Sequence, residues 1–191
     1  MIAYHVDRRG TLSPGQQILG TPAENLFGLP ILSQWGLDEV HLLDNLPRIF
    51  DRCVKAHIDW HNMEVCAERF RQIYYQDSVS RFSCFYAVPQ LDHFAFWADM
   101  IQIKPGDRIF QVHYDVPCEA YDARNLRVSA IDALFGPPAD DSAYIQDIVK
   151  TERALHHYWS HTFTDSPLPE LLIPLPVTIG DIVSLDSLPQ L

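Results

Sequence analysis

The sequence predicts an α+β fold in which small, split β-sheets, antiparallel or mixed, are flanked by helices. The first observation behind this prediction is the order of the candidate elements: strand, long helix, strand, helix, strand, helix and a final pair of strands. The second is that 191 residues, 47% of them hydrophobic, can bury one sizeable core. We therefore expect a single domain over residues 1–191.

The first half of the chain predicts one strand and a helical region. Residues 2–7 alternate apolar and polar side chains, which is typical of a short strand, and RRGTLSPGQQI supplies turn residues after it. Pro and Gly recur over residues 21–36, so an irregular segment is expected there, followed by a short helix over residues 38–50. Residues 52–75 lack Pro and Gly and repeat apolar residues at helical spacing, which predicts one long amphipathic helix or two abutting ones.

The middle of the chain predicts two strands around a helix. The stretch RFSCFYAV, residues 81–88, indicates a central strand that ends at Pro89, and DHFAFWADMI indicates a helix over residues 92–101. Residues 109–116, IFQVHYDV, alternate cleanly, which is the clearest strand signal in the sequence.

The last third predicts a helix and two strands. Residues 142–159 repeat apolar residues at helical spacing after a candidate Asp or Ser cap. Two short apolar runs in residues 167–185, separated by Pro174 to Pro176, predict a pair of late strands.

The charge and hydropathy of the chain exclude some classes of partner. A net charge of −11 without a cluster of Lys and Arg disfavours non-specific binding of nucleic acid. No apolar segment approaches the roughly 20 residues that span a bilayer, and the first residues lack the apolar core of a signal peptide. We expect no membrane association and a cytoplasmic location. Four scattered cysteines, Cys53, Cys66, Cys84 and Cys118, are expected to be reduced and mostly buried.

Histidine spacing raises the question of a metal site. His57 and His61, followed by Glu64, and also His157 and His161, are four residues apart, which on a helix places two imidazoles on one face. Neither pair has the glutamate of H-E-x-x-H, so we expect no metal and assign these histidines to solvated or core-edge positions. The sequence also lacks a G-x-S-x-G elbow and a Gly-rich phosphate loop.

Three segments, taken together, resemble the ordered motifs of the ADP-ribosyltransferase superfamily: AYHVDRR near the start, SVSRFSCFYAVPQLDHFAFWA in the middle and PELLIPLPVTIGDIV near the end. They are most similar to a group of uncharacterised bacterial domains assigned to that superfamily, in which HNMEV and HHYW also have counterparts. Each motif is short, but their order covers most of the chain.

The resemblance implies an NAD-dependent ADP-ribosyltransferase, with NAD as a substrate. By position in the motifs, Tyr4 and His5 would contact NAD on the adenosine side, and Glu170 would be the catalytic carboxylate. The same comparison implies NAD contacts for a further set of side chains: Arg81, Ser83, Tyr86 and Trp97. Glu152 is the alternative catalytic carboxylate, because prolines flank Glu170.

The implied chemistry is consistent with these residue types. Breaking the bond between ribose and nicotinamide builds positive charge on the sugar, and one carboxylate beside the ribose stabilises that charge. The superfamily's arginine-modifying branch carries Glu or Gln two residues before the catalytic glutamate, where this chain has Leu168, so arginine is not the expected acceptor residue. A protein acceptor is favoured over nucleic acid because the chain is acidic.

Two alternatives stay open at this point. The chain could be an NAD glycohydrolase, with water as the acceptor, or a non-catalytic binding module on the same fold. A toxin or effector role is also implied by the resemblance. In that case a neutralising partner protein is expected, because an enzyme that consumes NAD harms its own cell.

Overall fold

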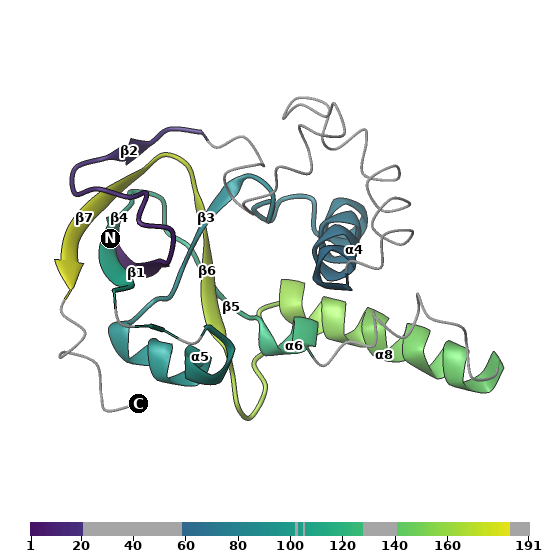
Figure 1. Ribbon diagram of the computed structural model, residues 1–191. Helices are drawn as coiled ribbons and strands as arrows, with labels where there is room; N and C mark the ends of the chain where they lie inside the picture. The colour runs from purple at the N-terminus through teal and green to yellow at the C-terminus, as the bar shows by residue number, and fades with distance from the viewer. Residues whose placement is uncertain (21–58, 102, 105, 128–140, 184–191) are drawn as a thin grey trace.

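The computed structural model describes residues 1–20, 59–101, 103, 104, 106–127 and 141–183, and its described strands form two small antiparallel sheets (Figure 1). Sheet A contains, in spatial order, β1 (Ile2–Asp7), β4 (Arg108–His113), β7 (Val177–Val183) and β2 (Gln17–Ile18). Sheet B contains, in spatial order, β3 (Cys84–Ala87), β6 (Pro169–Pro174) and β5 (Ala120–Asp122). Reciprocal main-chain hydrogen bonds between Tyr4 and Val88, at 3.0 and 2.8 Å, connect β1 to the end of β3.

The described helices lie outside the two sheets. They are α4 (Asp59–Tyr74), α5 (Phe94–Ile101), the one-turn α6 (Arg124–Arg127) and α8 (Asp141–Trp159), and a 3₁₀ turn (Leu91–His93) leads into α5. Figure 1 shows α4 and α8 together on one side of the molecule and α5 near β1.

Apolar side chains divide into three layers that follow the alternation of the strands. In β3, Phe85 and Ala87 pack toward sheet A, whereas Cys84 packs with α4 and α8. In β6, Leu171 and Ile173 likewise face sheet A. The resulting order is α4 and α8, then sheet B, then sheet A, then α5, where Val88, Phe94 and Ile109 close the last layer. Period-two alternation on both sheets therefore builds the core.

Several predicted elements are confirmed. The first strand spans Ile2–Asp7 as expected, and the helix predicted over residues 142–159 is α8. The helix predicted over residues 92–101 is confirmed as the 3₁₀ turn and α5. The two late strands are β6 and β7, and they fall in different sheets. The α+β class with small split sheets is therefore correct, and all of the described pairings are antiparallel.

The strand predicted over residues 81–88 differs in two ways. It begins only at Cys84, because Arg81 and Ser83 belong to a turn in which the Ser83 N–H donates to the carbonyl of Ser80. It is also an edge strand of sheet B, so the prediction of a central strand was wrong; β6 is the middle strand. Length and aromatic content indicated a strand but not its place in the sheet.

Short elements were missed by the pattern. β2 and β5 have two and three residues, too few for alternation to be recognised, and each exists through pairing with β7 or β6. The clearest strand signal, residues 109–116, corresponds to β4, which ends at His113. In β4, Ile109 is buried although it lies on the outer face of sheet A, because α5 covers that face.

Some predictions fall outside the described residues. They are the irregular segment over residues 21–36, the helix over 38–50, the start of the helix over 52–75, Cys53 and His57. The described part of that long helix is α4. Within the described residues, no helix is both long and apolar enough to cross a bilayer.

The histidine pair at the end of α8 does not share a helix face as predicted. α8 ends at Trp159, and His161 follows it with a positive φ of 55°. Its Nδ1 lies 3.0 Å from the carbonyl oxygen of Ala120, whereas His157 is exposed on α8. Among the described cysteines, Cys84 is buried, Cys66 and Cys118 are partly buried, and all three are free thiols.

Candidate functional site

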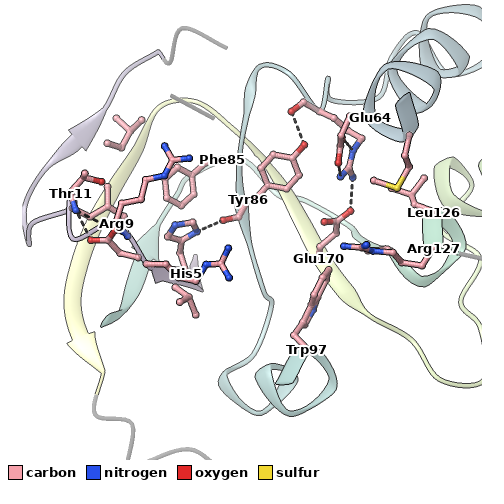
Figure 2. A pocket seen from close by; sticks show the side chains of 18 of the residues that line it. His5, Arg9, Thr11, Glu64, Phe85, Tyr86, Trp97, Leu126, Arg127 and Glu170 are labelled. Atoms are coloured by element: carbon pink, nitrogen blue, oxygen red, sulfur yellow. Dashed lines mark hydrogen bonds and ion pairs between the residues drawn. The ribbon is translucent and has the colours of Figure 1, made fainter. Parts of the chain in front are cut away.

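A pocket of about 680 Å³ opens where the two sheets meet the helices (Figure 2). In Figure 2, His5 and Arg9 lie at one end, Glu64, Arg127 and Glu170 at the other, and Tyr86 between them. Its walls come from the following residues: His5 to Arg9, Thr11, Leu12, Gln16, Ile18, Met63, Glu64, Arg81, Phe85, Tyr86, Trp97, Ala123, Leu126, Arg127 and Glu170. Segments from the start, middle and end of the chain therefore share one cavity.

Five of the seven site residues predicted from the sequence line this pocket: His5, Arg81, Tyr86, Trp97 and Glu170. The other two, Tyr4 and Ser83, do not. Alternation along β1 turns Tyr4 toward the layer under α5, and Ser83 lies exposed in the turn before β3. No ligand-binding role follows for either residue from its position.

His5 is held in one tautomer by the main chain of β3. Its Nδ1 lies 2.7 Å from the carbonyl oxygen of Tyr86 and donates to it, so in the neutral ring Nε2 carries the lone pair. Burial lowers the pKa of His5, and this effect outweighs the Tyr86 hydrogen bond and the charge of Asp7, which raise it. The ring also contacts Phe85, with centroids 4.7 Å apart. His5 is thus a neutral, oriented hydrogen-bond acceptor.

Asp7 organises the loop that follows β1. Its carboxylate accepts hydrogen bonds from the main-chain N–H groups of Arg9, Thr11 and Leu12 at 3.1, 3.3 and 3.0 Å, and from the side chain of Arg108 at 2.8 Å. Burial raises the pKa of Asp7, but the hydrogen bonds from these donors together lower it by more, so the pKa is below its usual value. The carboxylate therefore stays charged and fixes a turn that carries Arg8 and Arg9 into the pocket wall.

The carboxylate of Glu170 is part of a buried ion-pair network that has Arg81 at its centre. Nη1 of Arg81 donates to Glu170 Oε1 at 2.5 Å and also to the hydroxyl of Tyr158. Nε and Nη2 of Arg81 bind both oxygens of Glu64 at 2.6 and 2.8 Å. Tyr158 in turn donates to Glu170 Oε1 at 2.7 Å. One guanidinium therefore bridges two carboxylates from different elements.

The network continues behind the pocket. Glu68, which is fully buried on α4, accepts the main-chain N–H of Arg81 at 3.2 Å and the guanidinium of Arg71 at 2.8 and 3.0 Å. Burial lowers the pKa of Arg81, but Glu170 and Glu64 raise it to well above its usual value. Arg81 thus stays charged, and among the described residues its guanidinium binds protein groups rather than pointing at an open anion site. The resemblance implies an NAD contact for Arg81; in the structure its guanidinium is bound by Glu64, Glu170 and Tyr158.

Two aromatic side chains form the walls near Glu170. The hydroxyl of Tyr86 donates to the carbonyl oxygen of Arg81 at 2.8 Å, and the guanidinium of Arg81 lies 5.1 Å from the centre of the Tyr86 ring. The indole N–H of Trp97 donates to the carbonyl oxygen of Pro169 at 3.0 Å, which ties α5 to the residue before Glu170. Both rings are half-buried and fixed, which suits a surface that stacks on a planar group.

The pocket has the opposite charge balance from the chain as a whole. Four arginines and three carboxylates line the pocket, whereas the whole chain carries a net charge of −11. One of these carboxylates, that of Asp7, is paired with Arg108, which lies outside the pocket. Arg8 donates to the carbonyl oxygen of Ile101 at 2.9 Å, and Arg127 is exposed at the end of α6. Cations concentrated at a pocket of an acidic protein indicate an anionic ligand.

Sequence reasoning missed several of these groups. Arg8 and Arg9 stand in the quoted stretch AYHVDRR, and an Asp followed by a Gly-containing turn is the signal that could have placed them. Glu64 was considered beside His61 as part of a metal spacing and stands in the HNMEV motif, but no role at this site was predicted for it. Arg127 has no local signal, because one-turn α6 was not predicted.

The structure also bears on Glu152, the alternative catalytic carboxylate, and on the question of a metal site. Glu152 is exposed on α8 and is not one of the pocket residues. No group of three His, Cys, Asp or Glu side chains is arranged to hold a metal ion in the part of the chain that the structure describes. Glu170 and Glu64 are the carboxylates that reach the pocket beside Arg81.

A family model described as a protein of unknown function, DUF2441, matches residues 3–185, which is most of the chain. No curated protein matches the sequence. The description of the family assigns no activity, and the residues of the pocket are what point to a function.

Proposed function

The chain belongs to the DUF2441 family, and we propose that it is an NAD-dependent ADP-ribosyltransferase whose NAD site is the pocket between His5 and Glu170. The single observation that carries the proposal is that these two residues, from strands at opposite ends of the chain, line one cavity. The superfamily motifs predict this meeting of first-strand histidine and late-strand glutamate, and local sequence spacing does not. A volume of about 680 Å³ falls in the usual range of small-molecule pockets.

The charges along the pocket suit an elongated dinucleotide. Arg8 and Arg9, carried on the Asp7 turn beside His5, supply the positive charge that a pyrophosphate requires. Nε2 of His5 is the acceptor of the neutral ring and fits a ribose hydroxyl. The faces of Tyr86 and Trp97 suit the stacking of an aromatic ring such as nicotinamide.

The opposite end of the pocket suits a developing positive charge. Glu64 and Glu170 share one guanidinium, so this set of three groups has a net charge of −1. In the proposed reaction the bond between ribose C1′ and the nicotinamide nitrogen breaks, and its electron pair leaves with nicotinamide. The acceptor then forms a bond to C1′ and loses a proton. A carboxylate beside the ribose stabilises the cationic transition state more than the ground state.

The test uses the full-length chain and NAD. We expect NAD binding by calorimetry and release of nicotinamide measured by chromatography. If the protein neither binds NAD nor releases nicotinamide, the proposal is wrong, and the non-catalytic module becomes the better interpretation. Binding without release, with every candidate acceptor in a cell lysate present, would also overturn the enzymatic proposal.

The same experiment separates transfer from hydrolysis. With labelled NAD in a cell lysate, label on protein supports the transferase, as the acidity of the chain favours a protein acceptor. Label recovered only as free ADP-ribose would replace the transferase by an NAD glycohydrolase.

A further inference from the structure

Glu170 presents its two carboxylate oxygens to different surroundings. Oε1 accepts two hydrogen bonds from buried groups, one from Nη1 of Arg81 at 2.5 Å and one from the hydroxyl of Tyr158 at 2.7 Å. The side chain nevertheless lines the pocket, as Figure 2 shows. With Oε1 occupied on the protein side, Oε2 is, in the part of the chain that the structure describes, the oxygen left to meet a ligand.

Tyr158 is itself immobilised. It is fully buried near the end of α8, and its ring stacks on Tyr121 with centroids 5.1 Å apart and an angle of 23° between the planes. Burial raises the pKa of its hydroxyl well above the usual value, so the group keeps its proton. It accepts from Arg81 and donates to Glu170, which fixes the direction of its own O–H.

Arg81 is held just as firmly from the other side. Its guanidinium donates to Glu64 through two nitrogens, and its main-chain N–H donates to the carboxylate of Glu68. Both glutamates belong to α4. The orientation of Glu170 is thus set by α4 through Arg81 and by α8 through Tyr158, while β6 supplies its main chain.

From this geometry we propose that Tyr158 and Arg81 are positioning residues, which anchor Oε1 of Glu170 so that Oε2 is directed at the reacting ribose. The inference rests on the proposed function and deepens it, since it assigns the orientation of the catalytic carboxylate to two named donors. Neither donor touches substrate in this assignment. For Arg81, the role of positioning residue replaces the NAD contact that the resemblance implied.

The discriminating variant is Tyr158→Phe, which keeps the stacked ring and removes only the hydroxyl. Tyr121→Phe is the matched control, because Tyr121 is also buried and its hydroxyl bonds to Ser78 rather than to Glu170. Both variants should bind NAD with affinities within about twofold of the wild type. In Tyr158→Phe, kcat for nicotinamide release should fall roughly 10- to 100-fold, the loss expected when a reacting group is slightly misplaced. KM should change by less than threefold by the same reasoning, since binding is retained.

The outcomes separate this inference from the proposed function. If the wild type releases no nicotinamide, the proposed function and this inference both fail. An active wild type with kcat unchanged in Tyr158→Phe overturns the inference alone, as does an equal loss in Tyr121→Phe, because that loss would reflect packing. If Tyr158→Phe does not fold, Arg81→Lys provides the same test. Lysine keeps the positive charge but lacks the forked guanidinium, so kcat should fall while the affinity for NAD is retained. An Arg81→Lys enzyme with wild-type kcat would also overturn the inference.

Discussion

The imidazole of His5 and the carboxylate of Glu170 face one pocket, although β1 and β6 belong to different sheets. The connection between them runs through β3 and the turn that precedes it. The carbonyl of Tyr86 accepts from His5, and Arg81, five residues earlier, donates to Glu170. The segment from Arg81 to Tyr86 is therefore the structural link between the two ends of the pocket, and changes at either end can be tested separately.

Glu170→Gln should abolish nicotinamide release. The amide is nearly isosteric, but it lacks the charge that stabilises a cationic ribose, so we expect kcat to fall by about 10²-fold or more. Weakening the buried contacts with Arg81 and Tyr158 should cost about 1–3 kcal/mol in the free energy of unfolding. Chemical denaturation and a nicotinamide assay measure the two effects.

Glu152→Gln is the control for that experiment. Glu152 is exposed on α8, so the same chemical change should leave both activity and stability near wild type. If activity instead disappears in Glu152→Gln and survives in Glu170→Gln, the catalytic carboxylate has been assigned to the wrong residue.

Acid should destabilise the protein through His5. Burial lowers the folded-state pKa of His5 below 6.5, so the unfolded chain binds a proton at this residue at a higher pH than the folded chain does. The stability contributed by His5 is therefore fully present above about pH 6.5 and is lost as the pH falls below that value. Urea unfolding of wild type and of His5→Gln between pH 7.5 and 5.5 should show a flatter dependence in the variant. Equal slopes for the wild type and His5→Gln would show that the imidazole of His5 is solvated rather than held neutral.

Arg9→Gln should weaken NAD binding through the pyrophosphate. Loss of one charge-assisted contact should raise the Kd for NAD about tenfold, or by ~1.4 kcal/mol. The Kd for nicotinamide riboside, which has no pyrophosphate, should be unchanged. Lys104→Gln removes the same charge at an exposed position outside the pocket and should affect neither ligand. Parallel losses for both ligands would place Arg9 elsewhere on the bound molecule.

Much of the core could be predicted from the sequence, because its elements carry a strong period. β1 alternates, α8 repeats at helical spacing, and both were located to within one residue. Elements that depend on a partner could not be found in this way. β5 has only three residues, and its pairing with β6 is what makes it a strand. The turn at Arg81 arises for a similar reason, since its N–H is bound by the distant Glu68.

The candidate site was partly within reach of the sequence. His5 and Glu170 came from motif order, and their shared pocket follows from the tertiary fold. The partners of Arg81 could not be predicted, because its contacts with Glu64 and Tyr158 join residues that are far apart along the chain. A lone arginine before a strand gives no sign that α4 and β6 supply its counter-charges and α8 supplies a hydroxyl.

Gly10 makes a further prediction about the Asp7 turn. Its φ of +69° lies in the left-handed region, so Gly10→Ala should cost about 1–2 kcal/mol even though an added Cβ would meet only the side chain of Arg108, at 3.9 Å. Because the turn carries Arg9, the Kd for NAD should also rise. Gly10→Asn is the matched variant, since Asn adopts this conformation more readily. Isothermal titration of both variants checks this, and equal affinities for Gly10→Ala and wild type would separate the turn from ligand binding.

The placement of β6 and β7 has a consequence for biosynthesis. β6 is the middle strand of sheet B, and β7 lies between β4 and β2 in sheet A, so sheet B is incomplete until β6 has been made and sheet A is incomplete until β7 has been made. A nascent chain still missing residues 169–183 lacks Glu170 and the pairing partner of β3. Such long-range pairing makes folding slow. An activity that depends on this pocket would therefore begin only after the ribosome has finished these last strands.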